Sequence, residues 1–233
     1  MYRQARERGC IVVAITSGGK LRDLAICAGN HLVVLPEGMQ PRHAIGYMIG
    51  YTLAVIHAAG GPDLADRIAA FIPSLRKFRD ESLLPEECVA RRLAQVLMNK
   101  VPVICSNEQM RSVAFRWKTQ LNENAKYVAF CDSEPRFRMK GLQAWTGHNM
   151  AGCFLVLLVD PHTDAAELEV KELDESGADF AAIRLGGETS LENMFRAIML
   201  GDYVSMYIAQ MRGIDPAEVR PVMQMKAKLS RVL

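Results

Sequence analysis

The chain has 233 residues, half of them hydrophobic, so it is long enough to bury a sizeable core in one large domain or two small ones. Its 28 basic and 26 acidic residues nearly balance, and no basic run is interleaved with aromatic residues, so nucleic acid is not an expected partner. The first residues are charged and no run approaches the roughly 18 apolar residues of a membrane span, which predicts a cytoplasmic protein without a membrane partner.

The cysteines are scattered and form no CxxC pair, and most of them fall inside apolar patterns. We interpret them as reduced core residues. No set of His, Cys, Asp and Glu residues has the spacing of metal ligands, so we expect neither a metal nor a cofactor. The six cysteines are Cys10, Cys27, Cys88, Cys105, Cys131 and Cys153.

The first elements alternate between strand and helix. Tyr2 to Gly9 has the composition of a helix end, and Cys10 to Thr16 is a continuous apolar run typical of a strand buried on both faces. Ser17 to Lys20 forms a tight turn into a helix from Leu21 to Ala28. His31 to Pro36 is the next strand. This alternation predicts a parallel, doubly wound sheet, although two strands are too few for an independent one.

The next segments connect two units. A long helix follows Pro41, and a short one is expected from Leu64 to Phe71, ending before Pro73. The charged segment 74–85 is predicted to be a linker, with a new helix starting at Pro85. The expected organisation is a first domain at 1–73, the linker at 74–85 and a second domain at 86–233.

The second domain repeats the alternation of strands and helices, which again favours a parallel sheet. We predict one helix here to bend near Gly201. The expected strands are 101–105, 127–131, 154–160 and 180–185, and the expected helices are 112–124, 163–175, 191–212 and 217–232.

The stretch from Arg116 to Lys126 is unusually dense in varied polar residues. At helical spacing, Arg116, Gln120 and Glu123 share one face. The Glu123 carboxylate is flanked by two amides and approached by Arg116 and Lys118, as a positioned general base requires. The alternative is an ordinary solvated helix end, because structural charge networks use the same residues.

A second candidate feature is the turn Ser17-Gly18-Gly19-Lys20, where a strand leads into a helix. Backbone amides and a helix N-terminus at this position can hold an anion such as a phosphate, and Arg42 offers a cation nearby. The alternative is a plain turn without a ligand.

Four strings in this sequence resemble the bifunctional phosphoglucose/phosphomannose isomerases of the sugar-isomerase (SIS) superfamily. They are AITSGGKL at 14–21, PEGMQPRHAIGY at 36–47, RWKTQLNENAK at 116–126 and YIAQMRGIDPAEVRPVMQMK at 207–226. The resemblance implies an α/β fold of two SIS subdomains, each a flavodoxin-like parallel sheet sandwiched by helices. It also implies a homodimer that interconverts glucose 6-phosphate or mannose 6-phosphate with fructose 6-phosphate.

The resemblance also assigns roles to single residues. Glu123 matches the base that moves a proton between C1 and C2 through a cis-enediol. Lys226 matches a lysine near the sugar ring oxygen, and Arg42 matches an arginine that stabilises the enediolate charge. The candidate substrate-binding residues are Ser17, Gly18, Arg116, Lys118, Thr119, Gln120 and Asn122.

Two departures from the family pattern affect residues that the family uses for ring opening and for phosphate binding. The family's ring-opening histidine aligns with Met139, whose thioether cannot transfer a proton, so that step would pass to Lys140, His148 or water. The family's phosphate loop, resembling S-x-S-G-N-T-E-E-T, stands upstream of the segment that begins here, so we expect a truncated first subdomain.

Three functions are therefore open at this stage. One is an isomerase whose true start lies upstream of Met1. The others are a catalytically impaired protein that binds sugar phosphate, and a protein that pairs with a full-length paralogue.

Overall fold

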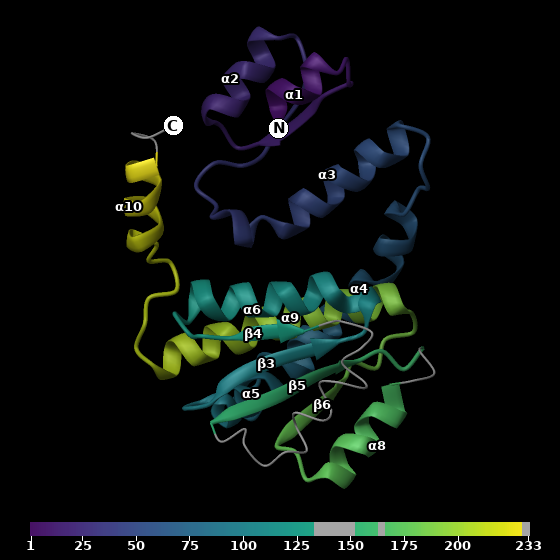
Figure 1. The fold of residues 1–233 in the computed structure, drawn as a ribbon. Helices are drawn as coiled ribbons and strands as arrows, with labels where there is room; N and C mark the ends of the chain where they lie inside the picture. Colours follow the sequence, from purple (N-terminus) through teal and green to yellow (C-terminus); the bar gives the residue numbers. More distant parts are fainter. Residues whose placement is uncertain (133–151, 163–165, 230–233) are drawn as a thin grey trace. The chain divides into compact units, whose positions relative to one another are not determined.

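The computed structural model describes residues 1–132, 152–162 and 166–229, apart from the side chains of residues 166, 169, 221, 226 and 227 (Figure 1). The chain divides into two compact units, Met1–Phe71 and Ile72–Leu233. Each unit contains a parallel sheet with helices, so the predicted α/β class is confirmed.

The first unit is built on two parallel strands, β1 (Val13–Thr16) and β2 (His31–Val34), with Val13 opposite His31. Tyr2 ties the first helix to this unit, because its hydroxyl donates to the Leu24 carbonyl and accepts from the Asn30 amide. The helices of this unit are α1 (Tyr2–Glu7), α2 (Gly19–Cys27), the short η1 (Pro41–His43) and α3 (Ile45–Ala58).

The second unit contains a four-stranded parallel sheet in the order β4-β3-β5-β6. This is the flavodoxin-like order, in which the first strand of the series lies between the second and the third. The strands are β3 (Val101–Ser106), β4 (Phe130–Asp132), β5 (Cys153–Val159) and β6 (Phe180–Arg184).

Helices cover both faces of this sheet, and α8 (Ala166–Ser176) lies on the opposite side from α6 (Arg111–Asn124) and α9 (Ser190–Met211) (Figure 1). The sequence of strand β5 is continuously apolar because both faces of the strand are buried. Val156 and Leu158 face α5, α6 and α9, whereas Leu155 and Leu157 face α8. The helices are α4 (Ala65–Ser82), α5 (Val89–Leu97), η2 (Glu108–Met110), α6 (Arg111–Asn124), α8 (Ala166–Ser176), α9 (Ser190–Met211) and α10 (Arg220–Leu229).

The helix expected to stop before Pro73 instead continues through it to Ser82, so most of segment 74–85 is helical. A proline inside a helix costs one backbone hydrogen bond, but tertiary contacts of the same helix offset that loss. Ser74 donates to Glu192, and Phe78 packs against the core of the second unit. The assignment of the two units to domains stays a prediction.

Other differences concern element ends. The helix predicted to start at Pro85 begins at Val89. Its N-cap is Cys88, whose thiol accepts a hydrogen bond from the Arg91 amide. Helix α9 is assigned as one continuous element through Gly201. Cys10 is exposed because β1 starts later than predicted, at Val13. Cys27, the last residue of α2, is exposed as well, so neither cysteine is a core residue.

Candidate active site

Helix α6 is fixed to helix α9 by Trp117. The indole is 1% exposed, and its Nε1 donates to the Ala197 carbonyl at 2.7 Å. Gly201 allows this approach, since a Cβ at that position would lie 2.5 Å from the indole Nε1. Therefore α6 has a fixed rotation about its axis, and the residues next to Trp117 have fixed directions.

Arg116 and Gln120 converge on Asp202 of α9. The Arg116 guanidinium donates to one carboxylate oxygen at 2.8 Å, and the Gln120 amide donates to the other at 2.9 Å. Arg116 and Gln120 thus share one face of α6, as expected from their spacing, but the carboxylate that they bond is Asp202 and not Glu123. Sequence analysis did not identify Asp202, because nothing near it in the sequence marks it as the partner of a helix more than 80 residues away.

The neighbouring polar residues of α6 also have structural partners. Thr119 donates to the Arg116 carbonyl at 2.9 Å, and Asn122 donates to the Tyr127 carbonyl at 2.8 Å. Lys118 lies 5.6 Å from the centre of the Phe115 ring, a cation–π distance. These contacts shape the end of α6, while the substrate-binding role of the three residues stays a prediction.

Glu123 lies in the last turn of α6 and is exposed. It opens on a pocket of about 540 Å³ that belongs wholly to the second unit. The pocket combines two carboxylates with apolar side chains, which is a suitable lining for a small polar ligand. Its lining residues are Asn122, Glu123, Lys126, Tyr127, Val128, Glu218, Val219 and Val222.

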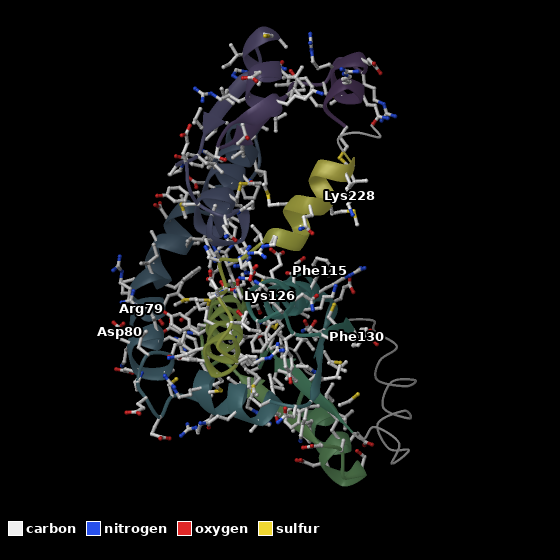
Figure 2. The ribbon with its side chains drawn as sticks, turned by 90° about the vertical axis from the view of Figure 1, so that its left-hand side faces the viewer. Arg79, Asp80, Phe115, Lys126, Phe130 and Lys228 are labelled. Carbon is white, nitrogen blue, oxygen red and sulfur yellow. The ribbon has the colours of Figure 1, made fainter. Side chains whose placement is uncertain are left out.

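Two cations complete the C-terminal end of α6. Lys126 donates to the Glu123 carbonyl at 2.7 Å, and Arg212, the C-cap of α9, donates to the Ala125 carbonyl at 2.7 Å. Positive charge is favourable here because the last carbonyl groups of a helix carry partial negative charge. Figure 2 shows Lys126 at the junction between α6 and the segment that leads to α10.

The second unit also contains a buried ionic network. Glu192 of α9 accepts hydrogen bonds from Ser74, from the Glu188 amide and from Arg196. Burial raises the pKa of the Glu192 carboxyl, but these hydrogen bonds and the Arg196 charge outweigh burial and hold that pKa below its ordinary value. This network therefore fixes α4 to α9 through an ionised carboxylate.

The remaining candidates of the first unit are Ser17, Gly18 and Arg42. Ser17 is exposed, and the Gly18 amide donates to the Thr16 hydroxyl at 3.2 Å, so one amide of the proposed anion site is already bonded within the turn. Arg42 is 9% exposed and lies in η1. The structure supports a defined turn here, and the anion site stays a prediction.

Other candidates fall outside the described part of the chain. Met139, Lys140 and His148 lie in the segment 133–151, and the side chain of Lys226 in α10 is also outside it. Within the described ranges, no helix has the length and apolar character of a membrane span. Among those same residues, no group of three or more His, Cys, Asp or Glu residues is placed to hold a metal ion.

Comparison with known proteins confirms the resemblance seen in the sequence. The model of the bacterial phospho-glucose isomerase C-terminal SIS domain matches residues 86–229. A bifunctional phosphoglucose/phosphomannose isomerase of Thermoplasma acidophilum is 29% identical over 232 residues, covering 97% of this chain and 70% of that protein. A protein of the same name from Caldicellulosiruptor bescii is 29% identical over 248 residues, covering 99% of this chain and 72% of its own length.

A solved structure supports the fold. Glucosamine-6-phosphate deaminase from Thermotoga maritima aligns with a TM-score of 0.64 at 15% identity, covering 91% of this chain and 65% of that chain. At this identity the likeness shows the fold alone. The family match includes α6, Glu123 and the pocket beside it. The chain therefore belongs to the bifunctional phosphoglucose/phosphomannose isomerase family, with the bacterial phosphoglucose isomerase C-terminal SIS domain at residues 86–229.

Proposed function

We propose that this protein is an aldose–ketose isomerase of hexose 6-phosphates, with Glu123 as its base. The substrates would be glucose 6-phosphate or mannose 6-phosphate, and the common product would be fructose 6-phosphate. The observation that carries the proposal is an exposed carboxylate on a pocket of about 540 Å³, inside the segment matched by the family model.

The proposed chemistry needs only one base. The Glu123 carboxylate takes the proton from C2 of the open-chain aldose, the electron pair of that C–H bond forms the C1–C2 double bond, and the C1=O π pair moves onto O1 to give an enediolate. A proton then passes from the C2 hydroxyl to O1. As the C2=O bond of the ketose forms, the electron pair of the C1–C2 double bond takes the proton back from the same carboxyl onto C1. Glucose and mannose derivatives differ only at C2, which is planar in the enediol, so both give one intermediate.

Two cations are proposed to assist. Lys226 would favour ring opening near the ring oxygen, and it belongs to α10, the helix whose residue Val222 lines the pocket. Arg42 would stabilise the negative charge that develops on the enediolate, a role suited to a fixed guanidinium. We also propose that Arg116, Lys118, Thr119, Gln120 and Asn122 contribute to substrate binding, directly or by shaping the end of α6.

A second candidate is a catalytically impaired protein that binds sugar phosphate or pairs with a paralogue. The resemblance to the family favours it, because the position of the family's ring-opening histidine falls on Met139 in this sequence. A protein without that acid would depend on the small open-chain fraction of its substrate in solution. For the active form we propose a homodimer, which sedimentation equilibrium can test.

The test compares the wild type with Glu123→Gln, which keeps the shape of the side chain and removes the base. Turnover of glucose 6-phosphate and mannose 6-phosphate is expected to fall by roughly 10²- to 10⁴-fold, the range of a positioned acid–base group, while the unfolding transition stays in place. Glu108→Gln is the matched control, since Glu108 is an exposed carboxylate on η2 that pairs with Arg111.

The possible outcomes separate the two candidates. Unchanged turnover in Glu123→Gln refutes the assignment of the base. A wild type that binds fructose 6-phosphate in calorimetry without isomerising it supports the impaired protein instead.

A further inference from the structure

Lys126 has an unusual backbone conformation for its residue type. Its φ is +51°, and among the described non-glycine residues only Asn99, at +65°, shares a positive φ. Lys126 follows Ala125, the C-cap of α6, where a left-handed residue is usually glycine because a Cβ is unfavourable there. A lysine at this position indicates that its side chain offsets the backbone cost.

The Lys126 side chain joins two segments. Its Nζ donates to the Glu123 carbonyl at 2.7 Å, the Glu218 carbonyl at 2.7 Å and the Asp215 carbonyl at 3.4 Å. An ammonium group has three N–H donors, so this arrangement uses all of them on backbone oxygens. The Lys126 charge is therefore engaged with the main chain and is not the group that would hold a phosphate.

The two joined segments line the same pocket. Asn122 and Glu123 line it from the end of α6, and Glu218, Val219 and Val222 line it from the second segment. We infer that Lys126 is a positioning residue, which holds the segment 215–219 against the end of α6 and so keeps this part of the pocket lining beside Glu123. This inference deepens the proposed function and rests on it for its kinetic consequence.

Arg212 also binds the end of α6, so the loss of the Lys126 side chain can be tested without unfolding that helix end. Its guanidinium donates to the Ala125 and Lys126 carbonyls at 2.7 and 3.1 Å, and it stacks on the Tyr127 ring at 5.1 Å. The end of α6 thus has a second anchor from α9. Loss of the Lys126 side chain is expected to release the segment 215–219 while Glu123 keeps its place on the helix.

The experiment uses Lys126→Gly, which removes the ammonium and also relieves the left-handed backbone. Asn99→Gly is the matched control, because it gives the same backbone relief at the end of α5 and away from the pocket. Lys126→Arg tests rescue, since a guanidinium also donates to several carbonyls. Hydrogen exchange is followed at the Glu218 and Met223 amides, which are bonded to the Asp215 and Val219 carbonyls.

We expect exchange at these amides to rise at least tenfold in Lys126→Gly, with an unfolding temperature close to that of the wild type. KM for glucose 6-phosphate is expected to rise at least tenfold, with a smaller change in kcat, because the base itself remains. In Lys126→Arg, both the exchange rate and KM are expected to stay near their wild-type values. Asn99→Gly is expected to change neither. A lysine that only capped the helix would be replaced by glycine without a change in KM.

Unchanged exchange in Lys126→Gly overturns the inference, whatever the activity. Faster exchange with unchanged KM also overturns it, because the segment would then be held without serving the pocket. A wild type that does not isomerise hexose 6-phosphates refutes the proposed function instead, and hydrogen exchange still decides whether Lys126 holds the segment.

Discussion

Substitution of Gly201 tests the packing of α6 on α9. The directions of the site residues on α6 depend on this packing. In Gly201→Ala the new Cβ would lie 2.5–2.6 Å from three atoms of the Trp117 indole, closer than non-bonded atoms approach. The ring is buried, and its Nε1 is already bonded to the Ala197 carbonyl at 2.7 Å. The ring must therefore move, and its hydrogen bond is strained or lost.

Opposing terms set the size of the effect. Alanine is favoured over glycine inside a helix by about 0.5–1 kcal/mol, which opposes the clash. Overpacking of a core costs about 1–3 kcal/mol, and a buried N–H left without its acceptor costs about 1–3 kcal/mol more. The net expectation is a loss of about 1–5 kcal/mol in the free energy of unfolding.

Urea unfolding followed by far-UV circular dichroism measures this loss. Trp117→Phe is the partner variant for a double-mutant cycle, because phenylalanine is smaller and has no N–H. In that background the cost of Gly201→Ala is expected to shrink markedly. Equal or greater stability of Gly201→Ala in the wild-type background would refute the close approach of Trp117 to α9.

Two further predictions concern stability. The side chain of Glu192 is 4% exposed, and the pKa of its carboxyl is lowered in the folded protein. The contribution of Glu192 to the free energy of unfolding is therefore fully present above the ordinary pKa of 4.5, and it is lost as the pH falls through the lower folded pKa. Glu192→Gln is expected to cost about 3 kcal/mol at neutral pH and to flatten the acid limb of stability, and an unchanged limb would contradict this. Gly50→Ala in α3, where a new Cβ meets open space, is expected to stabilise by about 0.5–1 kcal/mol, and thermal unfolding that shows a loss would contradict it.

Most of the fold could be predicted from the sequence because its local signals agree. Strand β5 is continuously apolar, and β3 and β6 lie within a residue or two of their predicted positions. Helix α4 was predicted too short, since Pro73 and the charged residues after it are typical of a helix stop and a linker. Contacts of Ser74 and Phe78 with distant residues decide its length, and local patterns do not contain them.

The candidate site was predictable only in part, for a similar reason. The density of polar residues around Glu123 predicted a site at the end of α6, and a pocket lies beside that end. Helical spacing placed Arg116 and Gln120 on one face, but it could not reveal that Asp202 lies opposite them. Lys126 could not be predicted as a left-handed residue, because composition favours glycine at that position.

Helix α4 bears on how such proteins could exchange parts during evolution. The family match begins at residue 86, yet Leu83 is fully buried in the core of the second unit and its carbonyl accepts from the Tyr207 hydroxyl at 2.6 Å. Upstream of it, the Phe78 ring lies 5.2 Å from the Arg196 guanidinium. A chimera that joined residues 86–229 to a relative's front half would depend on that relative for the residues at positions 78 and 83. The second compact unit thus begins upstream of the family match, at Ile72 within α4.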